Sequence, residues 1–102
     1  MMGFTKHTFP IRMIDTAPNP IEIVSGWKLG EVGFHRSSNG KAWIASDLMS
    51  GMRICTGVTR KEGAAWCEEN AQKIENKKLE PIYIQRVMEF RDLLRKELEN
   101  LE

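Results

Sequence analysis

The stretch that decides the fold runs from Lys28 to Ile74 and reads KLGEVGFHRSSNGKAWIASDLMSGMRICTGVTRKEGAAWCEENAQKI. Two short signals divide it. Asn39-Gly40 lies between two runs of strand-like residues, and both residue types tolerate the positive φ that a type I′ turn requires. Thr59 is followed three residues later by Glu62, which is the spacing of a capping box at the start of a helix. The stretch therefore predicts a β-β-β-α unit over residues 28–75.

The two strands beside Asn39-Gly40 alternate in a way that predicts the faces of the sheet, because successive side chains of a strand point to opposite sides. Pairing through a loop of two or four residues gives the same faces. One face is expected to carry Val32, Phe34, Trp43 and Ala45, and the other Glu31, Gly33, His35, Ile44 and Ser46. A turn over residues 47–51 should then lead into a third strand, over residues 52–58.

The residues before this unit predict further strands. Residues 4–14 have β-leaning composition, but Pro10 lacks a backbone donor, so an edge strand is expected there. Residues 21–24 predict a short strand that Ser25-Gly26 breaks or bends. The fold class expected for the whole chain is α+β: an antiparallel sheet of three to five strands, one helix packed on it, and a second C-terminal helix.

Two helices are expected in the C-terminal half. The first should start after Thr59 and run to about Glu75, with Trp66 as its main core residue. The second should begin at Pro81, which suits a first helical turn, and span residues 81–101. Its apolar stripe either packs on the chain's own sheet or forms a partner or dimer interface through Val87, Phe90, Leu94, Leu98 and Leu101.

Size and composition limit the class of protein. A chain of 102 residues fits a single domain over residues 1–102. No apolar run approaches the roughly 20 residues of a membrane helix. No apolar leader segment is visible at the start. The only cysteines, Cys55 and Cys67, are too few for a disulfide scaffold and favour a reducing cytoplasm.

No catalytic motif is present, so the chain is not expected to be an enzyme or to use a cofactor. The soft metal ligands His7, His35, Cys55 and Cys67 lack zinc spacing, and no metal site is expected. His35 and Cys55 could form a catalytic pair if the strand register placed them on one face. Such a pair needs a lowered thiol pKa and an oriented base, and no Asp or Asn nearby in the sequence supplies the orienting group.

Charge divides the chain into two unequal halves. Residues 1–61 carry eight Lys and Arg against four acids, and residues 62–102 carry seven against ten, although the formal net charge is only +1. The basic candidates for contacting nucleic acid gather around the hairpin and the first helix, with an aromatic residue among them that could stack on bases. They are Arg36, Lys41, Trp43, Arg53, Arg60 and Lys61.

Three strands followed by a helix, with Asn39-Gly40 and Thr59 to Glu62 at the boundaries, loosely resemble the arm-type DNA-binding domain of tyrosine recombinases over residues 28–75. The resemblance implies a DNA-contacting sheet. This chain departs from that family in being less basic and in adding an acidic helical half, and no functional motif is shared.

The absence of catalytic groups, the charge division and the long terminal helix favour a small, non-enzymatic intracellular binding protein that acts through protein–protein contacts. Its size and lack of motifs are similar to those of accessory or inhibitor proteins of phages and mobile elements. The expected partner is another protein or a second copy. The alternative is a DNA- or RNA-binding accessory protein that uses the basic hairpin face, and its affinity would fall steeply with salt.

Overall fold

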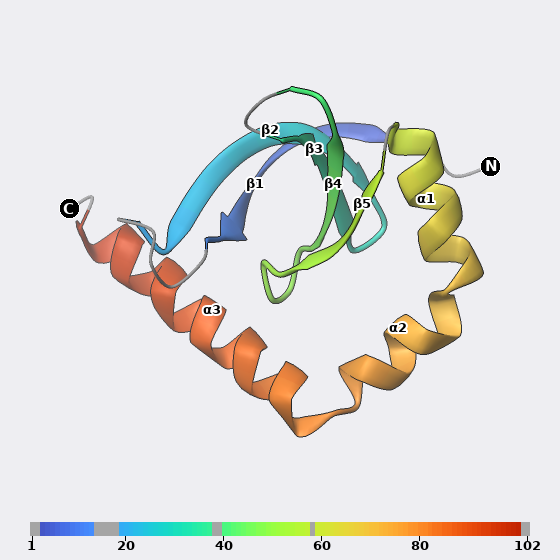
Figure 1. The fold of residues 1–102 in the computed structure, drawn as a ribbon. Coiled ribbons are helices and arrows are strands. Elements are labelled where there is room, and N and C mark those ends of the chain that lie inside the picture. Colours follow the sequence, from blue (N-terminus) through green and yellow to red (C-terminus); the bar gives the residue numbers. More distant parts are fainter. Residues whose placement is uncertain (1–2, 14–18, 38–39, 58, 101–102) are drawn as a thin grey trace.

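A computed structural model describes residues 3–13, 19–37, 40–57 and 59–100. A five-stranded antiparallel sheet, in the order β1-β2-β3-β4-β5, is followed by three helices (Figure 1). This confirms the α+β class. The elements are β1 Thr5–Arg12, β2 Ile21–Leu29, β3 Val32–Arg36, β4 Trp43–Asp47, β5 Arg53–Gly57, α1 Arg60–Glu69, α2 Ala71–Lys78 and α3 Pro81–Asn100.

The central hairpin has the expected faces. Phe34 lies opposite Ala45 and His35 lies opposite Ile44, so the two predicted sets are on opposite sides of the sheet. The backbone N–H of Ser37 donates to the carbonyl of Ala42 at 2.8 Å and closes a loop of four residues. Gly40 has a φ of 72°, the positive value for which glycine is suited. The predicted turn residue Asn39 lies outside the described residues.

β2 is longer than the strand expected over residues 21–24, because it continues through Ser25-Gly26 to Leu29. β1 pairs with β2 from Thr5 to Arg12 and supports the strand along its length. Gly26 permits close packing here, since a Cβ at this position would lie 2.1 Å from the carbonyl oxygen of Phe34. β2 pairs with β3 only from Trp27 to Leu29. Its first part sweeps away from β3 in a wide arc (Figure 1).

The curved sheet brings the end of β1 to the β4–β5 turn. The backbone N–H of Arg12 donates to the carbonyl of Gly51 at 2.9 Å. Phe90 of α3 lies against the same glycine and is 1% exposed. These contacts join the two ends of the sheet to α3. The buried apolar core consists of Phe9, Ile11, Ile21, Phe34, Ala45 and Phe90.

α1 begins where the sequence predicts. Thr59 is its N-cap, and its hydroxyl accepts a hydrogen bond from the backbone N–H of Glu62 at 3.1 Å. The single helix expected to reach Glu75 is instead two helices, because Asn70 leaves helical geometry with a φ of −107° and a ψ of 18°. The Asn70 side chain donates to the carbonyl of Trp66 at 2.9 Å, a local bond of the kind that competes with the helical ladder.

Trp66 is not the core residue that the sequence predicts, since its side chain is 41% exposed. Gly63 makes the closest approach to the sheet, and a Cβ there would lie 3.1 Å from the Phe34 ring. Residues of a helix advance by about 100° each, so Trp66 projects about 60° away from the direction of Gly63. The contact line therefore passes beside Trp66, which faces the space between the sheet and α2.

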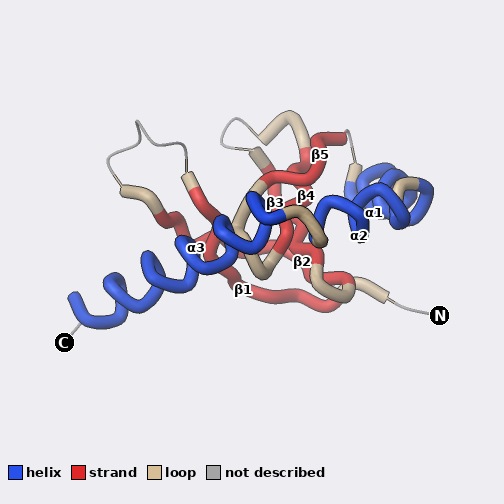
Figure 2. The backbone as a smooth tube through the Cα atoms, turned by 90° about the horizontal axis from the view of Figure 1, so that it is seen from below, coloured by secondary structure: helices blue, strands red, loops and turns tan. Residues whose placement is uncertain are grey.

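The helices form a V beneath the sheet. α1 and α2 descend on one side, and α3 returns along the other (Figure 1). Seen from below, α3 lies in front of the strands, whereas α1 and α2 lie to one side (Figure 2). α3 reaches the sheet at Phe90 and through an ion pair of Glu89 with Arg12 at 2.8 Å.

Candidate protein-binding cleft

A cavity of about 550 Å³ lies between β5, the β4–β5 turn, α2 and the start of α3. Its volume is within the range of pockets that hold ligands in other proteins. Most of its surface is apolar. We call this space the cleft. Its apolar lining consists of Met52, Ile54, Trp66, Ile74, Ile82 and Tyr83.

The apolar lining is open to solvent. Met52 and Trp66 are each 41% exposed, and Ile82 is 50% exposed. Met52 lies on the sheet side of the cleft, Trp66 on α1 and Ile82 on α3. Exposed apolar surface is therefore present on several walls. A contiguous exposed apolar surface with a polar rim is typical of a site that another molecule covers.

The rim of the cleft is mainly basic. Five basic side chains and two acidic ones line the cavity: Arg53, Lys73, Lys77, Lys78 and Arg86, with Asp47 and Glu80. Two of the basic groups are already paired, because Lys78 contacts Glu31 at 3.0 Å and Arg86 contacts Glu89 at 3.1 Å. Among the described residues, no ion pair is formed by the other three basic groups.

Asp47, at the end of β4, organises the polar part of the cleft. It is 5% exposed, and its Oδ2 accepts from the backbone N–H of Ser50 at 3.1 Å, from the Ser50 hydroxyl at 2.8 Å and from the Tyr83 hydroxyl at 2.8 Å. Its Oδ1 is buried without a hydrogen-bond partner in the described part of the chain. Burial and the bond to Asp47 both raise the pKa of Tyr83, so this phenol stays protonated and donates.

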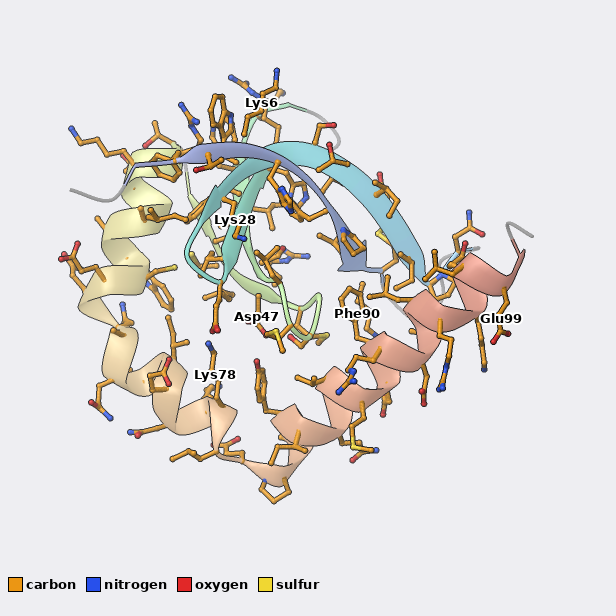
Figure 3. All side chains as sticks on the ribbon, turned by 180° about the vertical axis from the view of Figure 1, so that it is seen from behind. Lys6, Lys28, Asp47, Lys78, Phe90 and Glu99 are labelled. Atoms are coloured by element: carbon orange, nitrogen blue, oxygen red, sulfur yellow. The ribbon has the colours of Figure 1, made fainter. Side chains whose placement is uncertain are left out.

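Lys78 and Asp47 lie on facing sides of the cleft, one on α2 and one on the sheet (Figure 3). Burial lowers the pKa of Lys78. Its hydrogen bond to Glu31 and the charges of Asp47 and Glu31 outweigh that effect, so the pKa is raised overall. Lys78 therefore stays charged and ties the end of α2 to the β2–β3 turn. Lys78 and Tyr83 thus connect α2 and α3 to the sheet side of the cleft.

A second cavity, of about 420 Å³, has His35 in its lining. His35 is 5% exposed, and its Nδ1 is buried without a hydrogen-bond partner among the described residues. Burial lowers its pKa, as does the charge of Arg53, while Glu22 acts in the opposite direction. His35 is therefore neutral near pH 7.

The catalytic pair considered from the sequence does not form. Cys55 pairs with Ala45 across the sheet and His35 pairs with Ile44, so the two side chains lie on opposite faces. The thiol of Cys55 instead interacts with that of Cys67, and burial raises both pKa values, that of Cys67 to about 11. In the part of the chain that is described, no group of three or more potential ligands is placed to hold a metal ion.

The structure places the residues proposed for nucleic-acid contact in several settings. The Arg36 and Arg60 guanidinium groups lie 5.0 Å and 5.4 Å from the Trp43 ring centre. Arg60 is also 4.2 Å from the Trp27 ring and 5.0 Å from Phe4, and its Nη1 is buried. Three of the six, Arg36, Trp43 and Arg60, are thus brought together as a stack in which Arg36 is exposed and the other two are half-buried. Lys41 and Lys61 are exposed, and Arg53 lines the cleft as well as the second cavity, which Arg36 also lines.

The α3 stripe proposed as an interface is divided between the core and the surface. Phe90 is buried inside the chain, Val87 and Leu94 are half-buried, and Leu98 is 66% exposed. Leu101 lies outside the described residues. Sequence reasoning did not find the cleft, because its walls come from segments far apart in the chain. The only local signal was the group of lysines at 73, 77 and 78.

The chain matches no family model, no curated protein and no solved structure. None of the helices within the described residues is long and apolar enough to cross a membrane.

Proposed function

We propose that this chain is a small, non-enzymatic binding protein that holds a segment of a protein partner in the cleft. The observation that carries the proposal is the open cavity of about 550 Å³, three of whose apolar side chains, Met52, Trp66 and Ile82, are 41–50% exposed. Covering such side chains removes apolar surface from water, which is the main favourable contribution to association. The free thiols of Cys55 and Cys67 are consistent with a cytoplasmic location.

The hairpin offers less support for the nucleic-acid alternative. Trp43 has one guanidinium group near it from Arg36 and another from Arg60, so its ring is engaged within the chain. Of the basic residues proposed for phosphate contact, Arg53 lies on the cleft and Arg60 is half-buried against aromatic rings, so fewer of them are available for phosphate at the hairpin. We therefore place the interaction site between the helices and the sheet, away from the hairpin.

The proposal is tested by selecting peptides from a displayed random library on the full chain. The enriched peptides are then measured against two variants of α3, Ile82→Asp and Ile84→Asp. Ile82 lines the cleft and is 50% exposed, whereas Ile84 is 53% exposed and does not line it. The two substitutions are matched in chemistry, helix and exposure.

We expect Ile82→Asp to weaken peptide binding by tenfold or more, because a carboxylate would replace an apolar contact. A tenfold change corresponds to about 1.4 kcal/mol. Ile84→Asp should leave binding within about twofold of that of the original chain. Peptides that respond equally to both changes, or no enrichment at all, would contradict the proposal. If Ile84→Asp alone abolishes binding, the exposed outer face of α3 is the interface instead.

A further inference from the structure

We infer that the segment bound in the cleft is acidic and carries apolar side chains. This inference rests on the proposed function and adds the chemistry of the partner. It follows from three features of the cleft: unpaired basic groups on its rim, their distribution over two walls, and the apolar surface between them.

The first feature is an excess of basic groups that the chain itself does not neutralise. Arg53, Lys73 and Lys77 line the cleft, and none of them forms an ion pair with another described residue. The two acidic groups offset them only in part. Asp47 is buried, already accepts three hydrogen bonds and acts on Lys78, which leaves the exposed Glu80 against three basic groups. A bound carboxylate would therefore meet unpaired cations at the rim.

The second feature is the position of these groups. Lys73 and Lys77 are four residues apart on α2 and so share one face of that helix. Arg53 comes from β5, on the sheet side of the cleft. Cations spread along two walls complement several carboxylates spaced along a chain. A ligand with one anionic head group would engage one wall, whereas a peptide segment with several carboxylates can engage both.

The third feature is the apolar surface between the basic groups. Met52 on the sheet side, Trp66 on α1 and Ile82 on α3 are exposed toward the same cavity. Apolar side chains of a bound segment would cover these residues while its carboxylates reach the rim. Charge complementarity would then contribute mainly to specificity and to the rate of association.

Three synthetic peptides of equal length test the inference on the full chain. The first carries leucines at the three- and four-residue spacing of one helix face and glutamates at the positions between them. The second replaces each glutamate with lysine, and the third keeps the glutamates but replaces each leucine with serine. The readout is the indole N–H signal of Trp66 in nitrogen-15 NMR spectra. Trp27 and Trp43 do not line the cleft and act as internal references.

Two charge variants locate the binding site. Lys73→Glu with Lys77→Glu reverses charges on the cleft. Lys28→Glu with Lys61→Glu makes the same change in net charge at exposed positions that do not line it. We expect the acidic leucine peptide to shift the indole N–H signal of Trp66 and not those of the other two tryptophans. The cleft variant should bind this peptide about tenfold more weakly, as the loss of two charge pairs of up to about 0.7 kcal/mol each would produce. The control variant should change the affinity for this peptide by less than about twofold at moderate salt, where the long-range effect of its altered net charge is screened.

The outcomes separate the inference from the proposed function. Equal binding of the basic and acidic leucine peptides, or no effect of the cleft variant, overturns the inference and leaves the proposed function intact. Tight binding of the acidic serine peptide, or the same Trp66 shift with a short DNA duplex, shows a site for polyanions and also overturns it. If no peptide moves the Trp66 signal, the inference fails, and the library selection alone decides the proposed function.

Discussion

Asp47 is the residue on which the geometry of the cleft depends most directly. It links the β4–β5 turn to α3 through the Tyr83 hydroxyl at 2.8 Å. Tyr83→Phe removes this bond to a charged acceptor, and we expect the free energy of unfolding to fall by about 1.5–3 kcal/mol. Urea denaturation measures the change. A double-mutant cycle with Asp47→Ala should give a coupling energy of about 1 kcal/mol or more, and additive effects would contradict the direct link.

His35 makes stability depend on pH. Burial lowers its pKa from the ordinary 6.5, so the folded state favours the neutral imidazole. Its contribution to stability is fully present above pH 6.5 and is lost as pH falls below that value through the lower pKa of the folded state. The urea concentration at the midpoint of unfolding should therefore decrease as the pH is lowered across this range. His35→Gln lacks the titrating group, and its midpoint should change less over the same range. Parallel curves for the two chains would exclude His35 as the cause.

Trp66 shows how exposure changes an energetic expectation. A fully buried Trp66 would cost about 3–5 kcal/mol on substitution by Ala. Because the side chain is 41% exposed, we expect Trp66→Ala to cost less than about 2 kcal/mol. Chemical denaturation gives the value, with Phe90→Ala as the buried comparison. A loss for Trp66→Ala as large as that for Phe90→Ala would contradict the position of Trp66 beside the cleft.

The β4–β5 turn joins more elements than its length suggests, and Gly51 is the point of contact. Its φ is 71°, and a Cβ there would lie 2.4 Å from the Phe90 ring and 2.9 Å from the backbone nitrogen of Arg12. Gly51→Ala should therefore lower the free energy of unfolding by about 2–4 kcal/mol, through backbone conformation and overpacking together.

Gly30→Ala is the matched control for the turn. Gly30 has a similar φ of 62°, but nothing lies within 4 Å of a Cβ at that position. Only the conformational cost of about 1–2 kcal/mol should appear there. Thermal or urea unfolding of both variants separates the two contributions. Equal losses would show that Phe90 and β1 do not pack on the turn as described.

Local signals predicted the elements that have a local cause. The strands beside Asn39-Gly40 and the start of α1 at Thr59 follow from turn and capping chemistry, and the structure confirms both. The continuous β2 and the interruption at Asn70 were not predicted. β2 depends on pairing with β1, and Asn70 acts through a side-chain bond to the carbonyl of Trp66. Such effects depend on the surroundings of a residue and leave little trace in its sequence pattern.

The cleft illustrates the same limit for the whole chain. Its walls come from Met52, Trp66, Lys73 and Ile82, which belong to separate segments. The composition of each segment was visible, but their relative placement depends on the angle between α2 and α3 and on the contacts of Asp47 and Phe90. The unpaired lysines consequently appear only in the charge balance. For the stripe on α3 the sequence leaves packing on the chain's own sheet and a partner interface both open, and the structure buries Phe90 inside the chain.

α3 completes the fold as well as one wall of the cleft, so a chain that ends after Lys78 should not remain stably folded. It would lose the Tyr83–Asp47 bond, the Glu89–Arg12 ion pair and the burial of Phe90. Loss of a buried Phe side chain alone costs about 3–5 kcal/mol. That is a large part of the roughly 5–15 kcal/mol that stabilises a typical domain.

Proton NMR dispersion and urea unfolding of this truncated chain should show a weak transition or none. A chain that ends after Arg95 keeps all three contacts and should unfold within about 1 kcal/mol of the full chain, because exposed changes away from such contacts have small effects. If the chain that ends after Lys78 retains dispersed signals and a cooperative transition, α3 is only an attachment to an independent sheet. The partner-binding wall could then be removed without loss of the fold, and truncation would become the simplest test of binding.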